Sequence, residues 1–150
     1  MTEPDPDADL PACDPAVVLA ALRAGHVVAL GIRYVDHGSN WCALALDYDR
    51  RLVSDWKSGI LASGPIVSLI DSAAGMAVML RRDCLVAGST LDLRVDYLRP
   101  ARPGAAVTAR AECYRLTRRI AFVRALAHDG DAADPIAHAA GTFALSEATA

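Results

Sequence analysis

One carboxylate stands within the most apolar stretch of this chain. Asp71 lies in residues 63–80, where apolar side chains recur every three or four residues, as on one face of a helix. An ionisable group there costs free energy unless it is paired or used in chemistry. Its neighbours on the same helical face are mostly small: Val67, Ser68, Ala74 and Gly75. This space favours a ligand beside the carboxylate, or close approach by a second chain. A surface Asp, or one paired with a distant arginine, is the alternative.

The same helix is predicted to begin at a turn of small residues. Backbone N–H groups in the first turn of a helix have no partner within it, and the helix dipole adds positive charge there. Because Pro65 has no N–H, Ser63 and Gly64 are the candidates to polarise a carbonyl or to hold an oxyanion. An ordinary cap, with Ser63 as the N-cap residue, is the alternative.

Charged side chains elsewhere are weaker candidates. Arg118 and Arg119 lie at a predicted hairpin tip, and guanidinium groups suit phosphate recognition, although a solvated turn is the alternative. Poorer candidates of the same kind are Lys57, Arg81 and Arg82. The four histidines fall on predicted strands or turns away from the helix and form no recognisable triad, so we assign no role to His26, His37, His128 and His138.

Composition excludes several classes of protein. The 150 residues suit one domain, and 15 Lys and Arg against 18 Asp and Glu give no basic surface for nucleic acid. The cysteines lack metal-ligand spacing, so we expect reduced, mostly buried thiols at Cys13, Cys42, Cys84 and Cys113. The first residues are acidic, unlike a secretory signal, and the nearly apolar run 65–80 is shorter than the roughly 20 residues of a membrane span. We expect a cytoplasmic protein with no membrane partner.

The helix that carries Asp71 must be positioned by the other predicted elements of the chain, a short helix and six strands. Residues 1–12 predict a disordered lead, and residues 13–150 a single domain. Asp14 is expected to cap a short helix over residues 16–23. Strands are predicted over residues 27–35, 41–48, 89–98, 105–117, 120–128 and 136–145.

The order of these elements predicts the architecture. The strand over residues 89–98 alternates apolar and polar residues, which indicates one exposed face. The last four strands are joined by connections too short for helical crossovers, so the sheet is expected to be antiparallel. Only the long helix is apolar enough to sit inside it. The sequence therefore predicts an α+β fold, an antiparallel sheet wrapped around one long central helix.

Three segments, in order along the chain, resemble motifs of one family. Residues 59–75 resemble Gly-x-x-His-Gly-Gly-(x)6-Asp-x-x-x-Gly, residues 90–100 resemble Ser/Thr-x-Asp-Leu-x-Val-x-Tyr-Leu-Arg-Pro, and residues 140–145 resemble a closing strand. These are the motifs of the phenylacetate-degradation (PaaI-type) acyl-CoA thioesterases of the hot-dog superfamily. The resemblance covers most of residues 26–146.

The resemblance implies a hot-dog fold and a protein that works as a homo-oligomer, either a dimer or a dimer of dimers. Two active sites are then expected at each dimer interface. Asp71 of one chain is then the catalytic carboxylate, which activates water or attacks the thioester carbonyl of an acyl-CoA. The backbone N–H of Ser63 in the partner polarises that carbonyl, and Thr90 orients the water or the carboxylate. Coenzyme A is part of the substrate, and no cofactor is implied.

Two departures from the family motif bear on activity. The family's His before Gly-Gly is Ala62 here, and an Asn often found six residues earlier is Trp56. Their loss leaves the carboxylate and the backbone dipoles, while Trp56 offers a flat apolar wall for an aromatic or fatty acyl group, or for adenine. The residues expected to line the substrate site are Trp56, Ala62, Gly64, Ser68, Ser72, Arg118 and Arg119.

The sequence is compatible with three functions. The first is hydrolysis of an aromatic or medium-chain acyl-CoA. The second is a hot-dog module that binds acyl-CoA or acyl groups without turnover, suggested by Ala62 and Trp56. A dehydratase is the third, and it is disfavoured because the motif carries no histidine.

Overall fold

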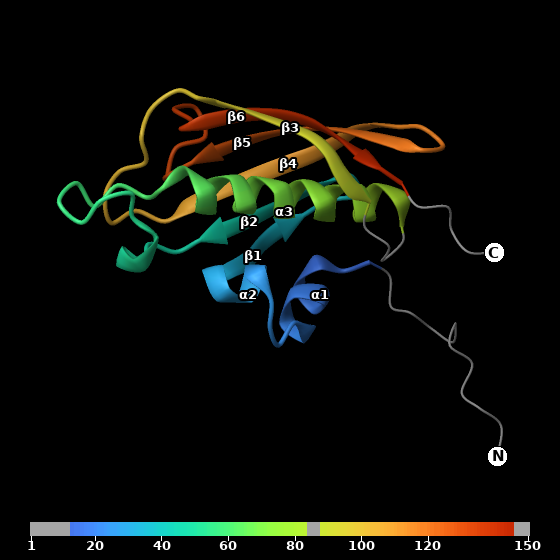
Figure 1. The fold of residues 1–150 in the computed structure, drawn as a ribbon. Helices are drawn as coiled ribbons and strands as arrows, with labels where there is room; N and C mark the ends of the chain where they lie inside the picture. The colour runs from blue at the N-terminus through green and yellow to red at the C-terminus, as the bar shows by residue number, and fades with distance from the viewer. Residues whose placement is uncertain (1–12, 84–87, 146–150) are drawn as a thin grey trace, which may run out of the picture.

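One long helix, α3 (Ser63–Arg82), runs through the fold, and the sheet curves around it (Figure 1). The computed structural model describes residues 13–83 and 88–145. One side of α3 is packed on β2, β4 and β5 of the sheet. The 20 residues of α3 are long and apolar enough to cross a membrane, but its apolar side is part of the hydrophobic core. Its apolar composition therefore reflects its place as the central helix.

Six strands form the sheet, and every neighbouring pair is antiparallel. Their order in space is β1-β2-β4-β5-β6-β3. The strand bounds are β1 (Ile32–His37), β2 (Trp41–Leu46), β3 (Ser89–Tyr97), β4 (Val107–Leu116), β5 (Ile120–His128) and β6 (Ala137–Ala144). An antiparallel sheet around one long helix confirms the predicted α+β, hot-dog architecture.

The expected strand over residues 27–35 is wrong in its first half. The chain forms a short helix there, α2 (His26–Leu30), and β1 begins only after it. Gly25 and Gly31 flank α2 with positive φ angles of 104° and 72°, and these conformations bend the backbone at both ends of the helix. Val27 and Leu30, one turn apart, pack against the hydrophobic core. The predicted first helix is confirmed as α1 (Pro15–Ala21), capped by the Asp14 side chain.

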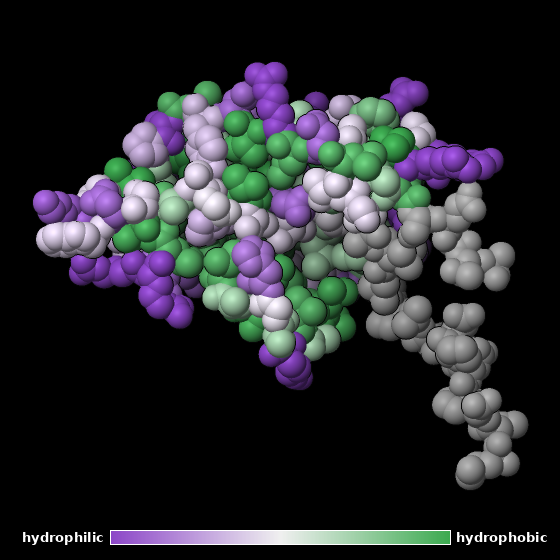
Figure 2. Space-filling model, viewed as in Figure 1, coloured by the Kyte–Doolittle hydropathy of each residue, from purple (hydrophilic) through white to green (hydrophobic). Residues whose placement is uncertain are grey.

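The exposed polar face predicted for β3 is confirmed, since Asp92, Arg94 and Asp96 are exposed. Its apolar face is covered in part: Leu93 and Val95 are half-buried and pack against the core. β3 lies at the edge of the sheet, and Leu91 and Tyr97 of its apolar set are 58% and 44% exposed. Apolar side chains gather over this strand on the surface (Figure 2). β3 packs only lightly on α3, so a single chain leaves part of the apolar surface of this strand exposed.

An ion cluster fixes the loop that leaves β3. The Asp129 side chain is fully buried and binds Arg99 at 2.7 Å and Arg102 at 3.1 Å. It also accepts the Arg102 backbone N–H. The Arg99 guanidinium holds the pKa of Asp129 well below its usual range. The cluster therefore ties the β3–β4 connection to the end of β5.

No disulfide joins the cysteines in the part of the chain that the structure describes. Cys13, Cys42 and Cys113 are buried, as predicted, and Cys84 lies outside the described residues. Burial raises the pKa of Cys42 to about 12, which removes this thiol as a nucleophile near neutral pH. Residues 1–12, for which a disordered lead was predicted, also lie outside the described part.

Candidate active site on the central helix

The side of α3 that faces away from the sheet carries the predicted helical site residues. Gly64, Ser68, Asp71 and Ser72 follow one another at helical spacing, and each is exposed or half-buried. The opposite side of the helix, represented by Leu69 and Ile70, has no exposed surface. We call these four residues the open strip of α3. It lies between α2 on one flank and β3 on the other.

Thr90 on β3 reaches the open strip. Its Oγ1 donates a hydrogen bond of 2.8 Å to Asp71 Oδ1. A register shift makes this possible, because Thr90 pairs with Phe143 while Asp92 pairs with the preceding residue of β6, Thr142. Residues opposite each other in an antiparallel pair share a face, and Phe143 points into the core. The bulge at Leu91 thus turns Thr90 toward α3, where regular alternation would place it on the outer face.

The start of α3 is held by a short ladder in the preceding loop. Ala62 N–H donates to Leu52 O at 2.9 Å, Ser54 N–H donates to Ile60 O at 2.8 Å, and Val53 bridges Leu61. The N-cap residue is Ala62, so the alternative of Ser63 as N-cap is wrong. Ser63 is the first helical residue, and no side chain caps this helix end. The N–H groups of Ser63 and Gly64 therefore occupy positions without helical acceptors.

A second side chain of β3 contacts the helix start. The Tyr97 hydroxyl donates to the Ser63 carbonyl oxygen at 3.1 Å. β3 thus provides a hydrogen-bond donor at Asp71 and another at the first turn of α3.

His26 contradicts the expectation that the histidines lie away from the helix. As the first residue of α2, it places Nε2 at 2.8 Å from Ser68 Oγ on the open strip. Ser68 Oγ also lies 3.1 Å from Gly64 O, and Ser72 Oγ donates to Ser68 O at 2.7 Å. Both serines therefore interact with backbone carbonyls one turn earlier, as serines within helices commonly do. Sequence spacing gave no signal for His26, because 42 positions separate it from Ser68.

The other predicted substrate contacts are not brought together within one chain. Trp56 lies in the loop before α3, 73% exposed, with Lys57 Nζ 5.5 Å from its ring centroid. Arg118 and Arg119 lie in the turn between β4 and β5, at the end of the molecule where α3 finishes (Figure 1). Ser63 and Asp71 are on the same helix but two turns apart, about 12 Å along its axis.

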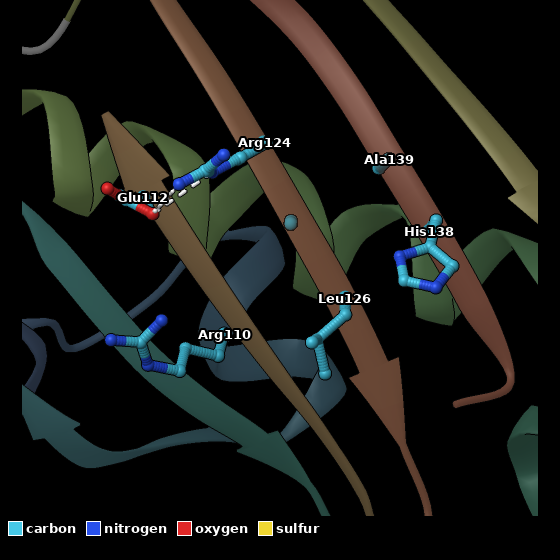
Figure 3. A pocket seen from close by; sticks show the side chains of 7 residues that line it. Arg110, Glu112, Arg124, Leu126, His138 and Ala139 are labelled. Carbon is cyan, nitrogen blue, oxygen red and sulfur yellow. Dashed lines mark hydrogen bonds and ion pairs between the residues drawn. The ribbon is translucent and has the colours of Figure 1, made fainter. Parts of the chain in front are cut away.

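A hollow on the outer sheet face contains none of these residues. It measures about 260 Å³ and lies over β4, β5 and β6, where Arg110, Leu126 and His138 point outward (Figure 3). Arg124 and Glu112 form an ion pair at its rim, at 3.0 Å. Within the described residues, no group of three or more His, Cys, Asp or Glu side chains could hold a metal ion.

Comparison with protein families identifies the chain. The model of the thioesterase superfamily matches residues 58–136, a range that includes the start of α3, Asp71 and Thr90. The chain belongs to the thioesterase superfamily.

Individual relatives agree with this assignment. The chain is 33% identical to the medium/long-chain acyl-CoA thioesterase YigI of Salmonella typhimurium over 116 residues, 69% of this chain and 74% of the relative. A Pseudomonas aeruginosa crystal structure is 34% identical, with a TM-score of 0.77 over 87% of this chain and 96% of that one. A mutant of the phenylacetic acid degradation protein PaaI of Thermus thermophilus is 27% identical, with a TM-score of 0.69 over 80% and 97% of the two chains.

These matches confirm the resemblance to PaaI-type thioesterases and the prediction of an enzyme. The chain is a hydrolase that acts on thioester bonds.

Proposed function

We propose that this thioesterase hydrolyses medium- to long-chain acyl-CoA esters at a site shared by two chains. The observation that carries the proposal is the Asp71 carboxylate on the open strip, held by Thr90 at 2.8 Å. The names of the relatives, medium/long-chain acyl-CoA thioesterases, support the substrate class. Aromatic acyl-CoA esters, predicted beside medium-chain esters, belong in the test.

The distance between Asp71 and Ser63 supports a site between chains. About 12 Å along one helix separates the carboxylate from the candidate oxyanion donor, too far for both to act on one carbonyl. In a two-fold dimer, a contact of Asp71 with the partner's helix start occurs twice, which makes the two helices antiparallel. Each dimer then has two equivalent sites along the paired open strips.

The chemistry follows from the residues. Asp71 removes a proton from water that attacks the thioester carbonyl, or attacks the carbonyl itself to form an anhydride that water then cleaves. The N–H groups of Ser63 and Gly64 stabilise the negative charge on the carbonyl oxygen. When the tetrahedral intermediate collapses, the coenzyme A thiolate leaves and takes up a proton. The free acid is the other product, released directly after attack by water or when water cleaves the anhydride. No cofactor enters this scheme.

The same antiparallel arrangement would allow Arg118 and Arg119 to contact the phosphates of a bound coenzyme A. In this arrangement the partner's helix would start opposite Asp71 and run toward the start of α3. The β4–β5 turn with Arg118 and Arg119 lies beyond Asp71 in the other direction, at the end where α3 finishes (Figure 1). A coenzyme A bound with its thioester between Asp71 and the partner's Ser63 would have its phosphates near basic side chains there. Trp56 would border the same opening from the partner chain.

A binding module without turnover is the second candidate. Ala62 stands where the family has a histidine, so one polar contact to the thioester is missing. In this function the open strip would hold the acyl group, and Asp71 would take no part in bond cleavage.

The test is thiol release from octanoyl-, palmitoyl-, benzoyl- and acetyl-CoA by the purified protein, with Asp71→Asn measured in parallel. We expect turnover of the medium or long esters, and loss of at least about 1000-fold in kcat for the variant while its acyl-CoA affinity is retained. Saturable binding without turnover by the wild type would favour the binding module. Turnover that persists in Asp71→Asn would exclude this carboxylate as the catalytic group.

A further inference from the structure

β3 contacts the helix at both groups that the proposed reaction uses. Thr90 binds the Asp71 carboxylate, and seven residues along the strand the Tyr97 hydroxyl binds the Ser63 carbonyl oxygen at 3.1 Å. The first contact orients a predicted reactive group directly. The second is made to a backbone carbonyl, so any effect on the reaction must act through the peptide group.

The Ser63 carbonyl belongs to the same peptide unit as the Gly64 N–H. A peptide unit is planar and its electrons are delocalised, so its C=O and N–H groups move and polarise together. A hydrogen bond accepted by the oxygen increases the positive charge on the N–H at the other end and restricts rotation of the plane. The Tyr97 hydroxyl thus acts on the orientation and the donor strength of the Gly64 N–H.

The surroundings of Gly64 suit a donor that must receive a ligand. A Cβ atom placed on Gly64 would meet no atom from elsewhere in the chain within 4 Å, so the space on the Cβ side of this residue is open. No side chain caps the helix end. Gly64 is the second helical residue, and its N–H has no helical acceptor.

We propose that Tyr97 is a positioning residue for the reaction, which aligns and polarises the Gly64 N–H as an oxyanion donor through the Ser63–Gly64 peptide. This inference rests on the proposed function. It makes Gly64 a donor beside Ser63, and it assigns to β3 the alignment of both the carboxylate and the oxyanion site.

Tyr97 is suited to this role. Its phenol has the hydrogen-bond geometry of a donor to the carbonyl, and partial burial raises its pKa, so the proton is retained at neutral pH. Tyr97 is 44% exposed, so removal of its hydroxyl alone is a small change in packing.

The variant that tests this is Tyr97→Phe. Loss of a whole oxyanion donor lowers kcat about 100- to 1000-fold. Here the donor remains and only its alignment and polarisation change, so we expect kcat to fall about three- to tenfold with KM within about twofold of wild type.

Tyr48→Phe is a matched control. The Tyr48 hydroxyl also donates to a backbone carbonyl, that of Gly59 at 2.9 Å, in the loop just before α3. The N–H of that peptide belongs to Ile60 and lies outside the proposed site. Tyr48→Phe should therefore leave kcat unchanged, although it loses the same kind of hydrogen bond.

A spectroscopic measurement separates alignment from a loss of folding. Octanoyl-CoA labelled with ¹³C at the carbonyl is bound to Asp71→Asn, and its carbonyl stretch is measured by infrared difference spectroscopy. Adding Tyr97→Phe should move the stretch to higher wavenumber, because the carbonyl accepts a weaker hydrogen bond, whereas adding Tyr48→Phe should not.

The outcomes distinguish this inference from the proposed function. Unchanged kcat and an unchanged carbonyl stretch in Tyr97→Phe would overturn the role of Tyr97. Equal losses in Tyr97→Phe and Tyr48→Phe would overturn it also, since they would point to the loop as a whole. A wild-type protein without turnover would overturn the proposed function, while the carbonyl stretch would still report whether Tyr97 acts on the bound thioester.

Discussion

Ser63 can lose its N–H without losing the helix, which allows the oxyanion donor to be tested directly. Ser63 is the first residue of α3, and proline is favoured there because its φ angle is helical and the N–H has no partner in the helix. The residue before a proline must be extended, and Ala62 already has φ −66° and ψ 155°. We therefore expect Ser63→Pro to change the free energy of unfolding by less than about 1 kcal/mol.

The catalytic effect should be large by comparison. If the Ser63 N–H binds the developing oxyanion, its removal costs about 2.7–4 kcal/mol in activation free energy, or 100- to 1000-fold in kcat. If the Gly64 N–H shares the charge, a smaller loss of about 10- to 100-fold is expected. Ser63→Ala keeps the N–H and removes only the hydroxyl, so its kcat should stay within about twofold of wild type.

Mixing two inactive variants then tests whether the site spans two chains. Ser63→Pro and Asp71→Asn are refolded together in equal amounts, so that about half of the dimers are mixed. Each mixed dimer would carry one intact site of two, and activity should recover to about a quarter of wild type. A site within one chain gives no recovery. Wild-type kcat in Ser63→Pro would refute the donor role of this N–H altogether.

Two further predictions concern contacts seen in the fold. Thr90→Val removes the hydrogen bond to Asp71. If a partner chain covers this bond, it contributes about 1.5–3 kcal/mol and kcat should fall tenfold or more, whereas loss of an exposed bond would lower kcat only about two- to fivefold. Thr90→Ser keeps the hydroxyl and should restore activity. Asp129→Asn should destabilise the protein by about 2–4 kcal/mol at pH 7, because it leaves Arg99 without its buried partner. The pKa of Asp129 is lowered in the folded state, so this stabilisation is present above the ordinary carboxyl pKa of about 3.9 and is lost as pH falls below it. Urea unfolding should therefore show a smaller difference between wild type and Asp129→Asn at pH 3 than at pH 7; an equal difference at both pH values would contradict the assignment.

The sequence predicted the elements whose patterns arise from burial. The helix around Asp71 and the strand over residues 120–128 were placed closely because their apolar periodicities reflect contact with one core. Residues 26–30 form a helix although Val27 and Val28 favour a strand by type. Flanking glycines and the core contacts of Val27 and Leu30 produce a short helix instead.

The side-chain partners of the site could not be read from spacing. Alternation along β3 assigns Thr90 to the face of Asp92, and only the bulge at Leu91 turns it toward Asp71. The motif resemblance identified Thr90, but the reason for its contact is a register shift that a single sequence does not reveal. The contacts of Tyr97 with Ser63 and of His26 with Ser68 join residues 34 and 42 positions apart, and they depend on the tertiary fold.

These contacts connect activity to the exposed edge of the sheet. β3 has an unpaired edge in the single chain and carries exposed apolar residues, a combination that natural sheets cover. The same strand holds Asp71 through Thr90 and the helix start through Tyr97. A partner that covers β3 would therefore bury apolar surface and also exclude water from both hydrogen bonds, which strengthens them. Assembly would therefore also align the site, because the edge strand that a partner covers is the strand that contacts both the Asp71 carboxylate and the start of α3.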